Sequence, residues 1–263
     1  MRLQIEAELD YHFVVETEVL LALEVARQDD QRLIEDCLTI DGSGPLRPIP
    51  GECAIGQRTW ATAEGRFVAR YRATVDVART IADFEGLEAV LPRDVPGEVV
   101  QFLWPSRYCQ SDRLYPFVTR TFGDLRGGPA VAAMADWIKD KLDYVPGSSD
   151  ATTTAVDSFV KRQGICRDYA HLMVSFARAA DIPARMVAVY GLGVDPPDFH
   201  AVTEIWLADG NRGGWHIVDA TGMTKADAVA RIAVGRDATD ISFMTSFGAA
   251  TLNAQKVAVA RAD

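Results

Sequence analysis

Apolar and polar residues alternate through much of the first hundred residues, which is the pattern of strands that bury one face. From Leu3 to Leu9 every second residue is apolar, and residues 66–77 repeat the alternation. Residues 19–25 and 33–40 are apolar segments of strand length. We therefore expect residues 1–98 to form an N-terminal antiparallel β domain that resembles a sandwich and has no catalytic site of its own.

The apolar spacing changes to that of helices after residues 83–98, a stretch with Pro92 and Pro96 that we interpret as a linker. We expect helices over residues 129–142, 154–163 and 166–180, followed by strands over residues 184–190, 200–207 and 215–219. Residues 99–263 are therefore expected to be a catalytic core in which a helix packs on an antiparallel sheet. The fold class of the whole chain is α+β.

Two local signals set the ends of the middle helix. Thr154 and Asp157 have the spacing of a capping box, with Asp in place of Glu or Gln. Gly164 stands where a glycine often ends a helix. The next helix, which starts near Cys166, would therefore follow directly after a glycine break.

Composition narrows the choice of partner and compartment. The chain of 263 residues has a net charge of −10 and a pI near 4.9, with no basic run, so we expect neither nucleic acid nor a membrane as its partner. Its four cysteines include no CxxC pair, and its N-terminus carries charge where a signal peptide would be apolar. These features predict a cytoplasmic protein with free thiols.

Cys166 differs from the other cysteines because it stands at the expected start of a helix. The free backbone N–H groups and the dipole at a helix N-terminus favour a thiolate, and the same N–H groups can bind an oxyanion. We interpret Cys166 as a nucleophile. Cys37, Cys53 and Cys109 lack this setting, and we expect them to be small buried residues.

The general base must be chosen among four histidines. His171 is closest to the nucleophile in sequence, but five residues of helix rotate it by about 140° from the thiol. We expect it to pack against the helix or to pair with Asp168, which is itself expected to be a helix-start or packing residue. His12 lies in the β-rich half and is expected to be structural. The choice is therefore between His200 and His216.

Strand geometry favours His200. If Asp209-Gly210 is a two-residue hairpin loop, Ala208 pairs with Asn211, and continuing the ladder brings His200 directly opposite Asp219. Opposite residues share a face and lie within reach of a hydrogen bond. The other histidine is an odd number of residues from Asp219 and points to the opposite face. We expect His200 to be the base and Asp219 to orient it.

Together, Cys166, His200 and Asp219 would supply the nucleophile, the base and the orienting carboxylate of a covalent acyl-transfer site. His200 would take the proton of Cys166, and the thiolate–imidazolium pair would attack an amide or ester carbonyl. Asp219 would fix the tautomer of the histidine. A zinc site of Cys166, His171 and His200 is an alternative, but the helical rotation of His171 opposes it. We expect no cofactor and no metal.

The motifs around these residues resemble the transglutaminase-like superfamily, specifically its bacterial cysteine-protease branch. The matching segments are Gly164–Leu172, Ile182–Arg185, Phe199–Ala201, Trp215–Thr221 and the junction-like segment Trp104–Tyr108. The resemblance covers nearly the whole chain, because the strand pattern before Trp104 is similar to the N-terminal β domain of these proteins.

The resemblance implies a papain-like Cys-His-Asp core, with the nucleophile on a helix and its partners on adjacent antiparallel strands. Carried over by position, it assigns the nucleophile to Cys166, the base to His200 and the orienter to Asp219. Where the family often has Ala-His-Ala-Trp, this chain has Phe199-His200-Ala201-Val202, a difference in the wall of the acyl pocket. Tyr144 and Trp137 are candidates for completing the oxyanion hole, although each is also a candidate core residue.

The function expected first is that of a cysteine-dependent amide-bond hydrolase, a peptidase or amidase that acts through a thioester on a peptide or protein substrate. A protein-glutamine transglutaminase or deamidase is the alternative enzyme. A non-catalytic interaction module on the same fold is the alternative of a different class.

Overall fold

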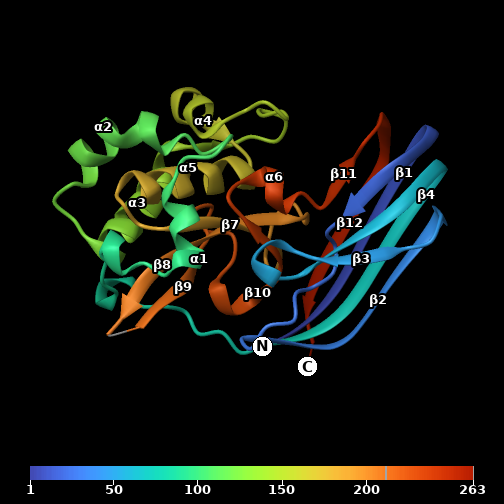
Figure 1. Ribbon diagram of the computed structural model, residues 1–263, viewed down its shortest axis with the longest axis horizontal. Coiled ribbons are helices and arrows are strands. Elements are labelled where there is room, and N and C mark those ends of the chain that lie inside the picture. Colours follow the sequence, from blue (N-terminus) through green and yellow to red (C-terminus); the bar gives the residue numbers. More distant parts are fainter. Residues whose placement is uncertain (211, 263) are drawn as a thin grey trace.

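The computed structural model describes residues 1–210 and 212–262, and it shows two antiparallel sheets with a layer of helices (Figure 1). The first is a six-stranded sheet in the order β11-β1-β4-β2, with β12 also paired to β1 and β3 to β4. Its strands are β1 (Arg2–Leu21), β2 (Gln31–Ser43), β3 (Arg47–Pro50), β4 (Gln57–Val77), β11 (Met244–Ser246) and β12 (Ala250–Arg261). The expected α+β class is confirmed.

Burial along β1 follows the alternation seen in the sequence. Leu3, Ile5 and Leu9 are at most 1% exposed, whereas the polar residues that alternate with them, Gln4 and Glu6, are exposed to solvent. The expected strand segments 3–9 and 19–25 belong to one strand of 20 residues as far as Leu21, where β1 ends. The buried side of this sheet packs against the other half of the chain.

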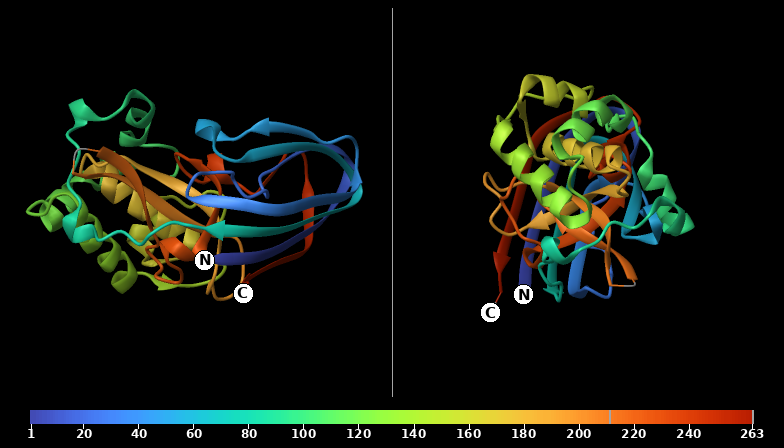
Figure 2. Two further views of the ribbon diagram at one scale, coloured as in Figure 1. Left: turned by 90° about the horizontal axis from the view of Figure 1, so that it is seen from below. Right: turned by 90° about the vertical axis from the view of Figure 1, so that its left-hand side faces the viewer.

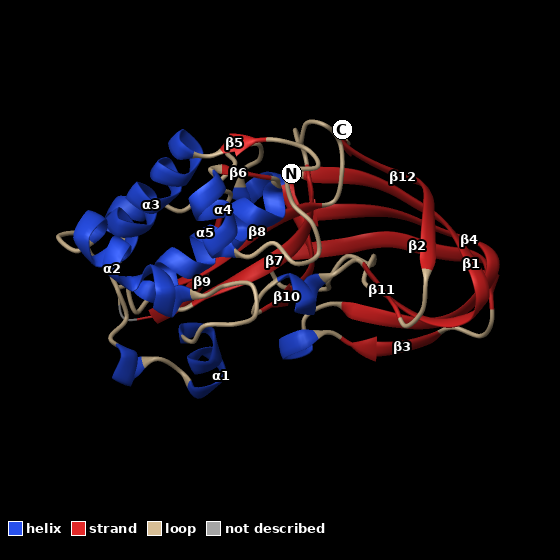
Figure 3. Cartoon of the chain, turned by 90° about the horizontal axis from the view of Figure 1, so that it is seen from above, coloured by secondary structure: helices blue, strands red, loops and turns tan. Residues whose placement is uncertain are grey.

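The second sheet has the order β10-β7-β8-β9, and helices cover it (Figure 3). Its strands are β7 (Ala184–Gly191), β8 (His200–Asp209), β9 (Arg212–Val218) and β10 (Val229–Gly235). The helices are α1 (Gly97–Val100), α2 (Ser111–Phe122), α3 (Gly127–Lys141), α4 (Ala155–Lys161), α5 (Cys166–Ala179) and α6 (Ala238–Ile241). A short parallel pair, β5 (Asp143–Tyr144) and β6 (Gln163–Gly164), lies between the helices.

The expected assignment of all residues 99–263 to the catalytic core needs a correction. Strands β11 and β12 pair with β1 and belong to the N-terminal sheet, with Leu3 opposite Arg261. Figure 2 shows the two chain ends side by side as a result. The physical reason is that one edge of β1 needs a partner, and β12 supplies it over most of its length.

The hairpin between β8 and β9 is shifted by two residues from the expected register. Asp209 pairs with Arg212 and Ala208 with Gly213, whereas the expected partner Asn211 lies outside the described residues. Gly210 has a φ of +62°, so it supplies the left-handed conformation at the start of the loop. Because the shift is an even number of residues, each side chain keeps the face on which it was expected.

Helix α4 confirms one expected end and corrects the other. The Thr154 hydroxyl accepts from the Asp157 N–H at 3.4 Å, and the Asp157 carboxylate accepts from the Thr154 N–H at 2.9 Å. The helix ends at Lys161, followed by Arg162 at a φ of 58°, and not at Gly164. Gly164 is needed for another reason: a Cβ atom there would lie 2.6 Å from Cβ of Asp168.

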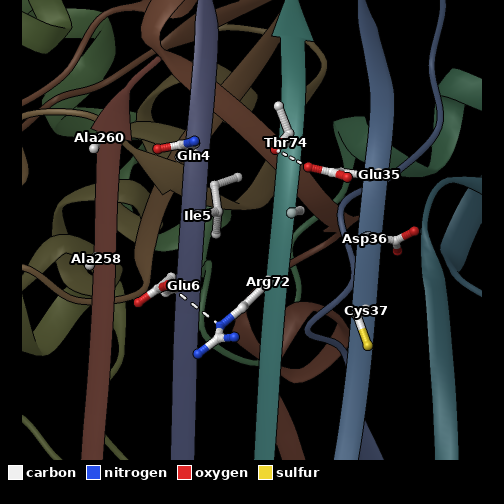
Figure 4. A pocket seen from close by; sticks show the side chains of 11 residues that line it. Gln4, Ile5, Glu6, Glu35, Asp36, Cys37, Arg72, Thr74, Ala258 and Ala260 are labelled. Atoms are coloured by element: carbon white, nitrogen blue, oxygen red, sulfur yellow. Dashed lines mark hydrogen bonds and ion pairs between the residues drawn. The ribbon is translucent and has the colours of Figure 1, made fainter.

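The outer face of the N-terminal sheet is polar and holds a shallow hollow (Figure 4). Cross-strand pairs line it, such as Glu6 with Arg72 at 3.4 Å and Thr74 with Glu35 at 3.1 Å. Cys37 is exposed on this face.

Of the three remaining cysteines, all expected to be buried, two are exposed. Cys37 and Cys53 are both exposed, because a small side chain on an outer strand face or in a surface turn needs no burial. Cys109 is fully buried as expected, and burial raises the pKa of its thiol to about 12.

A buried ionic network joins the two halves of the chain. Glu204 on β8 is fully buried and accepts hydrogen bonds from Arg185 on β7 at 2.7 Å and from Arg231 on β10 at 3.0 Å. Arg231 also binds Asp30, next to β2, at 3.1 Å, and Asp30 binds Arg79, just after β4, at 2.7 Å. Burial favours the neutral acid, but the two arginines beside Glu204 outweigh it and lower its pKa.

We expect the substitution Arg231→Met to destabilise the protein by about 3–5 kcal/mol near neutral pH, because it leaves a buried carboxylate with one partner fewer. The free energy of unfolding in urea measures this loss, and Arg2→Met, which breaks an exposed pair, serves as the control. Since the pKa of Glu204 is lowered on folding, its contribution is present above about pH 4.3 and is lost as the pH falls. The deficit should therefore shrink in acid. A variant as stable as the control would contradict the role of the network.

Candidate active site

Helix α5 begins at Cys166, the residue expected to be the nucleophile. The buried carboxylate of Asp168 accepts the N–H of Ile165 at 2.9 Å and fixes the first turn. This confirms Asp168 as a helix-start residue. The Cys166 thiol is partly exposed, and its sulfur lies 3.9 Å from the carbonyl oxygen of Phe199. The thiol therefore stands at a helix N-terminus and beside the residue that precedes His200.

His200 and Asp219 form a buried pair. Nε2 of His200 lies 3.0 Å from Oδ2 of Asp219, and the two side chains are 0% and 3% exposed. The observed ladder ends at the pair Thr203–Val218, and its continuation by one residue would place Val202, not His200, opposite Asp219. The pair is thus a diagonal contact between residues on one face, which the even shift preserved.

Asp219 accepts hydrogen bonds on both of its oxygens. Oδ1 accepts from the backbone N–H of Thr221 at 2.9 Å and from its hydroxyl at 2.7 Å. Oδ2 accepts from the N–H of Thr224 at 3.0 Å in addition to its contact with His200. Burial would raise the pKa of Asp219, but His200 and these donors lower it below its ordinary value. The carboxylate is therefore charged and held in one orientation.

The charged form of His200 is strongly favoured in this setting. Burial alone would lower its pKa, but Asp219 and the neighbouring Cys166 outweigh burial and raise the pKa to about 10. Nε2 faces Asp219, whereas Nδ1 is buried with no hydrogen-bond partner within the described residues. Nδ1 is therefore the nitrogen left to exchange a proton with the thiol of Cys166.

The other histidines lie in structural settings. His171 is fully buried, stacks on Tyr108 at 5.2 Å and accepts the N–H of Ala238 at 3.1 Å, and burial lowers its pKa to about 3. It packs within the core, which is one of its two expected roles, and it does not pair with Asp168.

The two remaining histidines also lie away from Cys166. His216 lies opposite Ile205 in the ladder, and burial lowers its pKa. His12 is exposed on β1.

Of the two oxyanion candidates, the structure brings only Tyr144 to the site. Trp137 packs among core aromatic residues, 5.0 Å from Phe117 and 5.4 Å from Phe176 between ring centroids. Tyr144 lines the same cleft as Cys166, and burial together with the charge of that cysteine raises the pKa of Tyr144 to about 12. Its hydroxyl therefore stays protonated and can donate a hydrogen bond beside the N–H of Cys166.

A cleft of about 690 Å³ contains Cys166 and His200. Asp219 lies behind His200 and is not among the residues that line the cleft. Residues from the far end of the chain complete its wall, among them Phe243, Thr245 and Gln255. No pattern in the sequence points to these residues. Thr221, in contrast, could have been predicted from sequence as a partner of Asp219, because an aspartate side chain often accepts hydrogen bonds from the residue two positions later in a turn.

The described ranges 1–210 and 212–262 contain no group of three or more His, Cys, Asp or Glu side chains that could hold a metal ion. His171, one member of the alternative zinc set, stacks on Tyr108 and accepts the N–H of Ala238. Within the same ranges, every helix is too short or too polar to cross a bilayer.

Comparison with known proteins gives the class. A solved structure from Cytophaga hutchinsonii, described as a putative cysteine protease, is 31% identical with a TM-score of 0.92 and aligns over 100% of this chain and 91% of its own. A model of the transglutaminase-like superfamily matches residues 118–220, which include Cys166, His200 and Asp219. These likenesses support a cysteine-dependent enzyme as the general class. The chain belongs to the transglutaminase-like superfamily, as its motifs predicted.

Two further matches are partial or weak and add little. An uncharacterized protein of Mycobacterium leprae is 33% identical over 123 residues, which are 43% of this chain and 42% of the relative. The chain therefore matches less than half the length of that relative. The periplasmic domain of TgpA from Pseudomonas aeruginosa has a TM-score of 0.43 and 19% identity, over 82% of this chain and 75% of that domain. This last likeness is too distant to support an argument about the present chain.

We expect Asp219→Asn to lower the pKa of His200 from about 10 to its ordinary value of about 6.5 or below, because burial then acts without the opposing carboxylate. An NMR titration of the imidazole ring measures the change. Asp198→Asn, at an exposed carboxylate in the same cleft, should leave the titration near that of the wild type. An imidazole that still titrates near pH 10 in Asp219→Asn would contradict the proposed pairing.

Thr221→Val should slow the alkylation of Cys166 by iodoacetamide about tenfold, because Asp219 loses a charge-assisted hydrogen bond from the hydroxyl. The pH profile of alkylation should also shift, since the pKa of Asp219 rises when a donor is removed. Thr221→Ser keeps the hydroxyl and should restore both properties. Wild-type rates in Thr221→Val would show that the backbone donors alone hold the carboxylate.

Proposed function

We propose that this protein hydrolyses amide bonds in peptides or proteins through a Cys166-His200-Asp219 triad. The observation that carries the proposal is the buried His200–Asp219 pair at 3.0 Å, in reach of a cysteine that begins a helix inside a cleft. A thiolate, a base and an orienting carboxylate are the parts that a covalent acyl-transfer site requires.

The reaction has two halves. The Cys166 thiolate attacks the carbonyl carbon, and the oxyanion forms beside the N–H of Cys166 and the hydroxyl of Tyr144. Protonated His200 gives its Nδ1 proton to the amide nitrogen, the C–N bond breaks, and an amine leaves a thioester behind. Neutral His200 then takes a proton from water, whose oxygen attacks the thioester. The C–S bond breaks and releases a carboxylic acid.

The same thioester could instead pass to an amine, as in a protein-glutamine transglutaminase. The two reactions differ only in the acceptor that attacks the thioester, water or an amine. A matched assay with and without a primary amine separates them by mass, because hydrolysis adds water to the cleaved product and transamidation adds the amine.

The proposal includes a reducing compartment, the cytoplasm, and no nucleic-acid or membrane partner. All four cysteines are free, which supports a compartment that keeps thiols reduced. The net charge of −10 supports the exclusion of polyanions.

Alkylation by iodoacetamide tests the proposal, with mass spectrometry to locate the modified cysteine. We expect Cys166 to react faster than exposed Cys37 and Cys53, at a rate that changes little between about pH 6 and pH 8, because the imidazolium holds the thiolate. Exposed Cys37 provides the control within the same sample, because it has no histidine partner like that of Cys166 and reacts with the same reagent.

His200→Ala should remove the advantage of Cys166 without changing the rate at Cys37. Cleavage of a fluorogenic peptide library by the wild type, and not by Cys166→Ala, would then establish hydrolysis. If Cys166 reacts with the same pH dependence as Cys37, the triad proposal is wrong and a non-catalytic binding module becomes the better description.

A further inference from the structure

One wall of the cleft comes from residues that the superfamily model does not reach. That model ends at residue 220, whereas Ile241 and Phe243 lie between β10 and β11 and also line the cleft that holds Cys166. The wall is fixed to the N-terminal half, because the carbonyl of Phe243 accepts the N–H of Ala22 at 2.9 Å.

Two stacked aromatic rings dominate this wall. The rings of Phe199 and Phe243 lie 4.5 Å apart between centroids, with 11° between their planes, and both are half-buried. Tyr190 supports Phe199 from a centroid distance of 5.6 Å, and its own hydroxyl donates to the carbonyl of Leu23 at 2.8 Å. The pair therefore forms a rigid apolar surface in a cleft that is open to a ligand.

The wall shares the cleft with the reacting atoms, and the backbone of Phe199 lies next to them. The carbonyl oxygen of Phe199 is 3.9 Å from the sulfur of Cys166, and Phe199 directly precedes His200. Met186 and Ala201 add further apolar surface to the same cleft. Apart from Cys166 and His200 themselves, the charged residues that line it are Arg107, Arg167 and Asp198, and each is at least partly exposed to solvent. An acyl group bound to Cys166 would therefore place its neighbouring side chain against an uncharged aromatic wall.

We propose that Phe199 and Phe243, with Met186 and Ile241, form a specificity subsite for a large apolar side chain in the acyl-donating part of a peptide substrate. The inference rests on the proposed function and adds a substrate class to it. A cleft of about 690 Å³ has the size of sites that bury most of a ligand of a few residues. An aromatic side chain would stack on the wall and exclude water from it, whereas a small side chain would leave the wall wet.

Peptidyl chloromethyl ketones test the subsite, because they alkylate a cysteine thiolate and carry a chosen side chain. The probes are acetyl-Ala-Phe, acetyl-Phe-Ala and acetyl-Ala-Ala chloromethyl ketones, with iodoacetamide as a probe that has no side chain. We expect one of the phenylalanine compounds to modify Cys166 at least about tenfold faster than acetyl-Ala-Ala, which is the discrimination that one apolar pocket usually provides.

Phe243→Ala should abolish this preference and leave the iodoacetamide rate at Cys166 unchanged. Phe243→Leu keeps an apolar side chain and should retain part of the preference even if the alanine variant folds poorly. Phe247→Ala is the matched control, because Phe247 is 66% exposed, packs on Trp60 and does not line the cleft.

The outcomes separate the two proposals. If Cys166 is reactive but all three ketones modify it equally fast, the subsite proposal is wrong and the triad proposal is unaffected. The same conclusion follows if the preference for phenylalanine persists in Phe243→Ala. An inert Cys166 toward iodoacetamide would overturn the triad and the subsite together.

Discussion

Helix α5 is buried on every side, and this constraint determines where the thiol of Cys166 lies. Phe176 on α5 packs against aromatic rings from three helices, among them Phe117 of α2 at 5.4 Å, Trp137 of α3 at 5.4 Å and Phe159 of α4 at 6.2 Å. At the C-terminal end of the helix, buried Arg178 donates to carbonyl oxygens of β7 and of the segments beside it. A helix held along its length cannot rotate, so its first residue stays fixed relative to the sheet that carries His200.

The buried charges of the sheet are a second constraint on the positions of the site residues. A carboxylate and an imidazolium are costly to bury unless each is fully paired, and Asp219 meets this requirement with three N–H or O–H donors besides His200. Glu204 satisfies it with two arginines on the neighbouring part of the sheet. In both places the charged partner comes from a different strand or loop, so the pairs also fix how the strands lie against each other.

Much of the site could be predicted from sequence because its chemistry is local. Cys166 can be recognised because it stands at the start of a helix. A single hairpin, two strands joined by a turn, is sufficient to bring His200 and Asp219 onto one face. The observed register differs by two residues from the expected one, but both side chains still lie on the same face, because side chains in a strand alternate with a period of two. Pairing between β1 and β12 depends instead on residues about 250 positions apart, which no periodicity reveals. The aromatic wall at Phe243 depends on a contact of similar range, the hydrogen bond that the N–H of Ala22 donates to the carbonyl of Phe243, and no periodicity reveals it either.

The return of the chain to β1 has a consequence for synthesis on the ribosome. Residues 166–219 emerge well before residues 250–261, so a nascent chain contains the whole proposed triad while one edge of β1 still lacks the partner strand that covers it. An uncovered strand edge is prone to pair with other chains, and the late partner is distant in sequence, which slows folding. The segment that includes Phe243 also emerges late. The proposed subsite would thus form after the proposed nucleophile, as the last part of the cleft.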